Sequence, residues 1–184
     1  MKYLIVVLFF LSACSDGIKT LPSSTGILSK VIFVVEDLLW ENQVKDVAFR
    51  TFGVPIQGLT QDESSFRVIQ VNHSEFKSIL KTHKNIVIIA KNVLTRNQKD
   101  KWANNQLVVK LEFKHEYNEI LKNINKVKAI FEFREIRILR NSISKSTQKI
   151  KEKHIKEEFN IETLIPSEYT IIKDTVALFW ATYN

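Results

Sequence analysis

Val31-Ile32-Phe33-Val34-Val35 is an unbroken run of β-branched and aromatic residues, which is typical of a strand covered on both faces. Glu36-Asp37 follows, and Asp37 is expected to cap a helix. Apolar residues then recur with a period of 3.6, and Gly53 and Pro55 are expected to end the helix, Gly53 as a left-handed C-terminal cap. The predicted buried stripe consists of Trp40, Val44, Val47, Ala48 and Phe52.

The same signals continue along the chain and define its fold class. Strand, helix, strand, short helix and strand in succession predict a sheet that is at least partly parallel. We therefore expect an α+β (α/β-like) fold with a single mixed sheet of roughly four to six strands, one long helix and two shorter helices. Further strands are predicted at 66–71, 85–90, 106–113, 169–173 and 176–183, helices from Ser74, from His115 and over 149–160, and loops at 54–65 and 91–105.

The N-terminus has the pattern of a bacterial lipoprotein signal. Lys2 precedes an apolar run from Tyr3 to Phe10, and Leu11-Ser12-Ala13-Cys14 resembles a lipobox. The apolar run is too short to span a bilayer, which takes about 20 residues, but it suits a signal peptide. We expect residues 1–13 to be removed and Cys14 to be acylated, so that the lipid bilayer is a partner. The alternative is an ordinary signal peptide followed by a free buried cysteine.

Several further expectations follow from that signal. Ser15 after the cysteine, rather than Asp, favours an outer-membrane over an inner-membrane location in the cell envelope. Residues 14–29 are expected to form a flexible linker, and residues 30–184 a single globular domain. Cys14 is the only cysteine, so its acylation leaves no thiol for a disulfide, a nucleophile or a metal site.

Composition narrows the class of partner. The chain has 184 residues and a formal net charge of +7, which becomes +6 when Lys2 is removed with the signal. A mild basic excess can attract anionic lipid headgroups or polyanionic glycans, but the simpler interpretation is a lysine-rich, solvated helix surface. Nucleic acid is not an expected partner of an exported lipoprotein; an envelope protein or a glycan is. The densest basic region contains Arg134, Arg137 and Arg140, which we interpret as an outer helix face paired in part with Glu132 and Glu135, or alternatively as an anion-binding patch.

No pattern in the sequence predicts a catalytic residue, a cofactor or a metal. None of the four histidines has a ligand-like spacing to another, and four glycines provide no phosphate-binding loop. Ligands in α/β sheets bind beyond the carboxyl ends of strands, which leaves five weak candidates for a ligand cleft. These are Glu36, Asp37, Trp40, Asp62 and Glu63. The simpler interpretation is that Asp37 caps the helix and Trp40 packs in the core.

Several segments, taken in order, resemble a family of uncharacterised Bacteroidetes lipoproteins, domain of unknown function 4837. Members of that family are longer, so the resemblance implies a shortened member or a fragment, incomplete at its C-terminus. It implies no activity and no catalytic residue. The segments are Val34–Trp40, Gly58–Glu63 with Phe66, Lys84–Val87, Trp102-Ala103, Gln106–Val109, Ile165-Pro166, Tyr169, Lys173–Thr175 and Phe179-Trp180.

These observations favour a membrane-anchored, non-enzymatic binding or scaffolding module at the cell envelope. Two alternatives remain open, an envelope-tethered hydrolase of unrecognised mechanism and a non-functional fragment of a longer lipoprotein. A cleft in which Asp, Glu and His converge with shifted pKa values would favour the hydrolase. A flat exposed apolar patch would favour the binding module.

Overall fold

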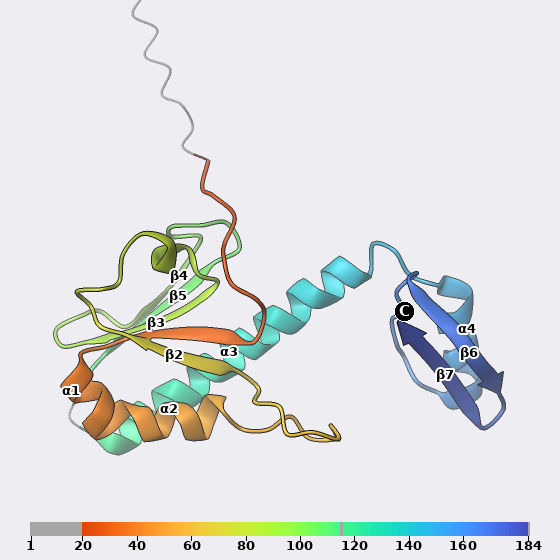
Figure 1. Cartoon of the computed structure of the whole chain (residues 1–184), viewed down its shortest axis with the longest axis horizontal. Coiled ribbons are helices and arrows are strands. Elements are labelled where there is room, and N and C mark those ends of the chain that lie inside the picture. Colours follow the sequence, from red (N-terminus) through yellow and green to blue (C-terminus); the bar gives the residue numbers. More distant parts are fainter. Residues whose placement is uncertain (1–19, 115, 184) are drawn as a thin grey trace, which may run out of the picture.

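The computed structural model describes residues 20–114 and 116–183 and confirms the predicted α+β fold, with a mixed sheet of five strands in the order β2-β1-β3-β5-β4 (Figure 1). The final two strands form a second sheet of their own instead of extending the first. The strands are β1 (Lys30–Val34), β2 (Arg67–Val71), β3 (Asn85–Ala90), β4 (Arg96–Lys99), β5 (Leu107–Glu112), β6 (Tyr169–Thr175) and β7 (Leu178–Tyr183). The helices are α1 (Asp37–Leu39), α2 (Lys45–Phe52), α3 (Tyr117–Ile143) and α4 (Lys149–Phe159), with a π-helical segment (Trp40–Val44) between α1 and α2 and a 3₁₀ helix (Ser78–Thr82) before β3.

The large sheet is parallel except at one edge. β1 pairs in parallel with β2 and β3, and β3 pairs in parallel with β5. β4 runs antiparallel to β5 and forms an edge of the sheet. Parallel strands need cover on both faces, which explains why β1 and β3 are apolar without alternation.

Strand β1 contributes side chains to two separate clusters, one on each face of the sheet. Val31, Phe33 and Val35 pack among residues of α2 and α3, while Ile32 and Val34 pack with Phe76 and other residues from the opposite face. The helical cluster is the larger of the two and contains Trp40, Val44, Val47, Ala48, Phe52, Ile120, Ile124, Val127 and Phe131. The stripe predicted for the first helix therefore does cover the sheet, as does an apolar stripe of α3, whose Tyr117 and Leu139 are left about half exposed.

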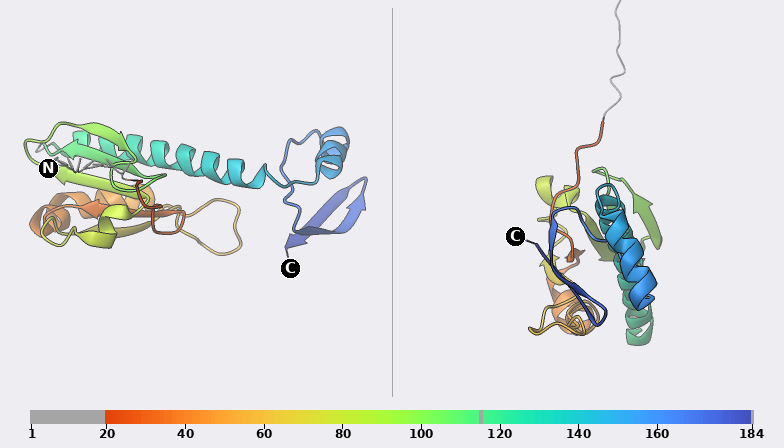
Figure 2. Two further views of the ribbon diagram at one scale, coloured as in Figure 1. Left: turned by 90° about the horizontal axis from the view of Figure 1, so that it is seen from above. Right: turned by 90° about the vertical axis from the view of Figure 1, so that its right-hand side faces the viewer.

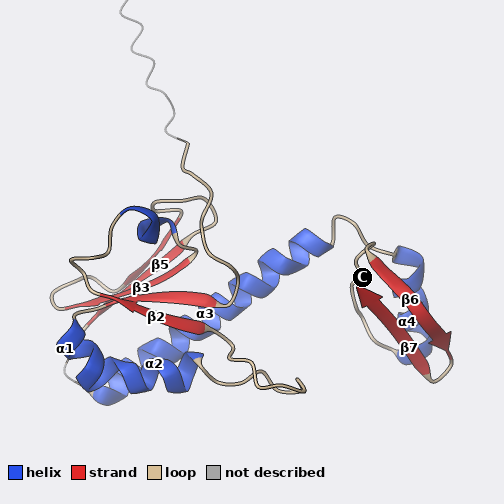
Figure 3. Ribbon diagram, in the orientation of Figure 1, coloured by secondary structure: helices blue, strands red, loops and turns tan. Residues whose placement is uncertain are grey.

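Figure 3 shows that the helical secondary structure after β1 is continuous from α1 into α2. Its ends differ from the sequence prediction. Glu36, not Asp37, is the N-cap residue, and the carboxylate of Asp37 accepts a hydrogen bond from Gln70 Nε2 at 2.8 Å. Gly53 ends α2 with φ −82°, so it is not the left-handed cap that we expected. Asp37 therefore connects the helix to β2.

Two further local predictions were wrong. β4 lies in a stretch predicted to be a loop, because its sequence Arg96-Asn97-Gln98-Lys99 has no apolar alternation and is held only by pairing with β5. Ser74 does not cap a helix; its amide and hydroxyl donate to the Asn72 side chain, and the 3₁₀ helix starts only at Ser78.

The second half of the expected linker is part of the folded body. The amides of Ser24 and Thr25 donate to the carbonyls of Asn104 and Thr82 at 3.0 and 2.9 Å, and Lys84 N donates to Thr25 O at 3.0 Å. Gly26 follows with φ +86° and lies against the imidazole of the buried His83. The segment from Pro22 onward is therefore held by backbone hydrogen bonds and is not a free spacer.

The C-terminal residues form a separate unit at the far end of α3. Figure 2 shows the long helix leaving the sheet and carrying α4, β6 and β7 at its end, which gives the described chain an elongated shape. β6 and β7 pair only with each other among the described strands. This unit has little core of its own, with Ile155 and Ile165 as its buried apolar residues.

Replacing Gly26 by Ala should destabilise the fold more than replacing Gly58 by Ala. Both residues have positive φ, which costs a non-glycine residue about 1–2 kcal/mol. A Cβ at Gly26 would also lie 2.3 Å from Nε2 of His83, whereas nothing lies within 4 Å of the corresponding position at Gly58. Urea denaturation of the two single variants measures this difference.

The His83→Ala background isolates the cause of the extra loss. If the overlap with the imidazole is responsible, Gly26→Ala in the His83→Ala background should lower the free energy of unfolding by only as much as Gly58→Ala does in the wild type. If Gly26→Ala lowers the free energy of unfolding equally with and without the imidazole, the packing that we describe is wrong.

Candidate functional site

The strand order creates a crevice beside β1. The chain passes from β1 to β2 on one side and then crosses to β3 on the other, so the connections diverge at the carboxyl ends of β1 and β3. Ligands of open α/β sheets bind at such a switch point. A cavity of about 560 Å³ lies there, which we call the switch-point cleft. Its lining consists of Glu36, Leu38, Leu39, Asn42, Gln43, His73, Ile89, Ala90, Lys91 and Phe113.

The helical side of the cleft carries polar groups that have no hydrogen-bond partner among the described residues. Asn42 and Gln43 are consecutive, and both line the cleft from the π-helical segment. Glu36 lines it from the turn after β1. Single π-helical turns within α-helices are frequent at functional sites. These side chains can therefore donate to and accept from a ligand without breaking an interaction within the described part of the protein.

The strand side of the cleft adds an imidazole and an ammonium group. His73 follows β2, and its Nε2 lies 3.0 Å from the carbonyl oxygen of Ile89. A carbonyl oxygen can only accept a hydrogen bond, so a neutral His73 carries its proton on Nε2. Its Nδ1 is then unprotonated and can accept a hydrogen bond. Lys91 follows β3 directly, forms no ion pair among the described residues, and precedes Asn92 in the left-handed conformation.

The five residues selected from the sequence do not converge on one site. Glu36 lines the cleft, Asp37 is bound to Gln70, and Trp40 is 6% exposed and packs in the core against Phe33 at a ring-centroid distance of 5.8 Å. Asp62 and Glu63 lie in the loop that precedes β2, which is the amino end of the strands, because Lys30 pairs with Arg67. Only Glu36 therefore belongs to the cleft.

Sequence reasoning missed His73, Lys91, Asn42 and Gln43. The rule that selected Glu36 would also have found His73 and Lys91, because both follow strands of the parallel sheet within two residues. Asn42 and Gln43 gave no such signal, because a helix with a period of 3.6 places them among ordinary exposed polar residues.

A buried polar cluster occupies the opposite, amino end of the sheet. Glu135 is 7% exposed and accepts hydrogen bonds from Ser29 N at 2.8 Å and Asn85 Nδ2 at 2.5 Å. Arg134 donates to Asn85 Oδ1 at 3.0 Å and to the carbonyl of Asn105. Burial raises the pKa of Glu135, and the hydrogen bonds from Ser29 and Asn85 oppose that shift.

This cluster corrects our interpretation of the basic region on the long helix. We predicted that Arg134 and Glu135 lie on a charged outer face, but both are partly or largely buried against the ends of β1, β3 and β5. Their hydrogen-bonding groups are used within the fold. The cluster therefore stabilises the attachment of α3 and does not offer a ligand site.

Two shallower grooves run along the exposed side of α3, and both include Ile136 and Leu139. The groove shared with α4 has a volume of about 660 Å³ and a charged rim. Most of its charges are already paired, with Lys149 at 3.0 Å from Glu152 and Lys156 at 2.5 Å from Glu162. The switch-point cleft differs because its polar side chains remain available.

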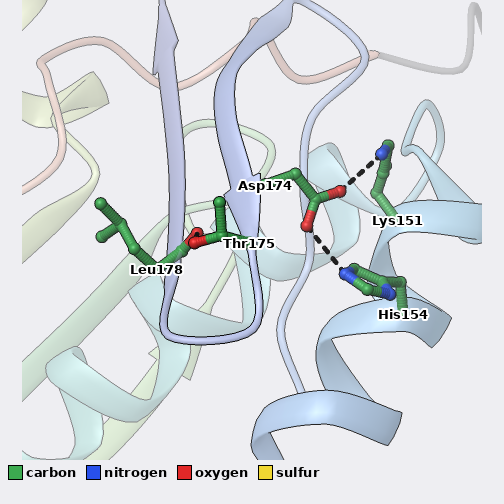
Figure 4. A network of polar contacts seen from close by, with 5 residues as sticks. All are labelled: Lys151, His154, Asp174, Thr175 and Leu178. Carbon is green, nitrogen blue, oxygen red and sulfur yellow. Dashed lines mark hydrogen bonds and ion pairs between the residues drawn. The ribbon is translucent and has the colours of Figure 1, made fainter.

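The hairpin of the C-terminal unit is attached to α4 by one carboxylate. Figure 4 shows Asp174 of β6 between Lys151 and His154, at 2.7 and 2.8 Å. The hydrogen bond from Lys151 is the main reason why the pKa of Asp174 is lowered. The hydroxyl of the neighbouring Thr175 donates to Leu178 O at 3.2 Å within the turn, so it is not poised beside the imidazole. The network is structural.

Residues 20–114 and 116–183 contain neither a cluster of metal ligands nor a helix that could span a membrane. No three His, Cys, Asp or Glu side chains there come together as a metal site. No helix there is both long enough and apolar enough to cross a bilayer. The predicted lipidation site, Cys14, and the signal peptide at 1–13 lie outside the described residues.

Comparison with protein families matched residues 24–144 to a domain of unknown function, DUF8532. The match begins in the docked N-terminal segment and ends one residue after α3, so it covers the large sheet and its helices and leaves out the C-terminal unit. The resemblance to domain of unknown function 4837 and its Bacteroidetes lipoproteins is therefore wrong, because the family that matches is a different one. That resemblance rested on short segments, none of which is specific by itself. Searches of curated proteins and of solved structures found no match.

Asp174→Asn should loosen the C-terminal hairpin without affecting the large sheet. The variant loses the charge that holds Lys151 and His154. Amide hydrogen exchange of peptides from β6 and β7 should accelerate, while Asp62→Asn, in the exposed loop before β2, should leave it unchanged.

The effect of this substitution should also depend on pH. A lowered pKa means that Asp174 stabilises the fold above the ordinary aspartate value of about 3.9, and that this contribution is lost as the pH falls through the lower folded value. The difference in hydrogen-exchange rate of β6 and β7 between the wild type and the variant should therefore shrink below about pH 4. A difference that persists in acid would contradict the role of the carboxylate.

Proposed function

The chain belongs to the DUF8532 family, and from its N-terminal sequence and its structure together we propose that it is a lipid-anchored, non-enzymatic binding module of the bacterial cell envelope. The switch-point cleft is the observation that carries the binding role. The side chains of Glu36, Asn42, Gln43 and Lys91 have no partners within the described residues, and the volume of the cleft is within the range of about 300–1,000 Å³ of small-molecule sites.

The chemistry of the lining supports binding over covalent catalysis. Among the described residues the cleft is lined by no serine, threonine or cysteine, so it lacks a hydroxyl or thiol nucleophile. Glu36, His73 and Lys91 are the lining groups that could move a proton, and Glu36 lies on the opposite side of the cleft from the other two. The envelope-tethered hydrolase therefore has less support than the binding module.

The anchoring role is supported by the N-terminal sequence. The apolar run and Leu11-Ser12-Ala13-Cys14 fit a lipobox, and among the described residues the backbone carbonyls of Leu21 and Pro22 are the first to accept hydrogen bonds from the body. An acyl chain on Cys14 would contribute about 0.8 kcal/mol per buried CH₂ to membrane binding, and two or more chains make it stable. The segment between Cys14 and Pro22 would then separate the body from the bilayer, with the outer membrane as the favoured location.

Cys14→Ser should release the protein from the membrane. In cells supplied with a clickable palmitate analogue, the wild type should carry the label and sediment with the envelope. The variant should be unlabelled, should keep residues 1–13, and should lose its detergent-requiring membrane association. A wild-type protein with an unmodified thiol and an uncleaved N-terminus would refute the anchor.

Occupancy of the cleft can be tested with an introduced thiol at Leu38, which lines the cleft and is 79% exposed. If Cys14 is acylated, Leu38→Cys carries the only free thiol. A bound ligand should slow its reaction with maleimide in isolated envelopes relative to the washed, purified protein. Leu94→Cys, at a position 75% exposed and outside the lining, should react equally in both. Equal rates for Leu38→Cys would count against a resident ligand.

A further inference from the structure

We propose that the switch-point cleft binds a saccharide, an uncharged ligand with several hydroxyl groups and an apolar ring face. The proposal rests on the binding role proposed above and adds the chemical class of the ligand. It follows from three properties of the lining, namely the type of its hydrogen-bonding groups, its charge and its apolar floor.

The hydrogen-bonding groups match hydroxyls. A hydroxyl donates one hydrogen bond and accepts two, so a sugar needs donors and acceptors close together. The amides of Asn42 and Gln43 each offer both, and they are adjacent on the π-helical segment. His73, held at Nε2 by the carbonyl of Ile89, offers Nδ1 as an acceptor. Two amides that donate and accept, and one imidazole nitrogen that accepts, therefore line the cleft.

The charges of the cleft balance. Glu36 contributes one negative charge and Lys91 one positive charge, so the lining has no formal net charge when His73 is neutral. A phosphate or a dicarboxylate would meet a single cation and a carboxylate of its own sign. It would also lack the cluster of cations or glycine-rich amides that phosphate sites use. A zwitterionic amino acid would satisfy Glu36 and Lys91 but would leave most of the amide groups unused.

The apolar part of the lining suits a sugar ring. Leu39, Ile89, Ala90 and Phe113 line the same cavity as the polar groups, and Ile89 and Phe113 are largely buried. A pyranose presents C–H groups on its faces and hydroxyls around its edge, so it can bury its faces against such side chains while its edge reaches the amides. The volume of about 560 Å³ allows a ligand larger than a single small ion.

The test is calorimetric titration of the mature, full-length protein in lauryldimethylamine oxide, a detergent without a sugar headgroup. The probes are glucose, cellobiose, N-acetylglucosamine and chitobiose, with alanine and inorganic phosphate as probes of the competing ligand classes. We expect at least one saccharide to bind at millimolar or lower concentration. Asn42→Leu and Gln43→Leu should each weaken it about tenfold, the effect of a lost hydrogen bond of about 1.4 kcal/mol.

Asn125→Leu is the matched control, because Asn125 is an exposed amide on a helix outside the cleft. Its saccharide affinity should equal that of the wild type, and circular dichroism of all three variants verifies folding. The proposal is overturned if Asn42→Leu and Gln43→Leu leave the saccharide affinity unchanged. It is also overturned if no saccharide binds to the wild type at millimolar concentration. Binding of alanine or phosphate that both cleft variants weaken would overturn the saccharide class but would leave the binding role intact.

Discussion

A single buried carboxylate fixes the geometry on which the rest of the structure depends. Glu135 on α3 accepts hydrogen bonds from the backbone before β1 and from Asn85 at the start of β3. Its neighbour Arg134 binds Asn85 and the carbonyl of Asn105, just before β5. Burying the carboxylate is unfavourable, as the raised pKa shows, and the hydrogen bonds offset that cost. The apolar contacts of α3 are non-directional, so this cluster determines where the helix lies along the strands.

Fixing α3 at the amino ends of the strands leaves the carboxyl ends free for a ligand. At the amino end, Asn85 and Gln106 are buried with their side-chain amides hydrogen-bonded to the protein. At the carboxyl end, Asn42 and Gln43 have no described partner. The two ends thus use the same residue type differently, for stability at one end and, in the proposed role, for recognition at the other. α/β sheets commonly separate these roles, because their connections diverge only at the switch point.

The sequence predicted the elements whose signal is local and missed those whose signal lies elsewhere in the chain. The run Val31–Val35 and the stripe of α2 are local patterns, and both were confirmed. Strand β4 is polar and exists because β5 offers it an edge, so no local pattern reveals it. Arg134 and Glu135 resembled surface charges because their partners are about 50 and more than 100 residues away. Of the five candidate residues only Glu36 lines the cleft, since strand order, which the sequence does not give, decides which loops meet.

Within the five residues of the π-helical segment, some side chains pack in the core and others line the cleft. Trp40 and Val44 bound this segment and are buried, while Asn42 and Gln43 between them line the cleft. A widened turn gives a less favourable hydrogen-bond pattern than an α-helix, so its position needs a compensating contact. Trp40 provides one, packing between Phe33 of β1 and Phe49 of α2. The aromatic side chain that we first considered for a ligand thus packs in the core, where it supports the turn that presents the two amides.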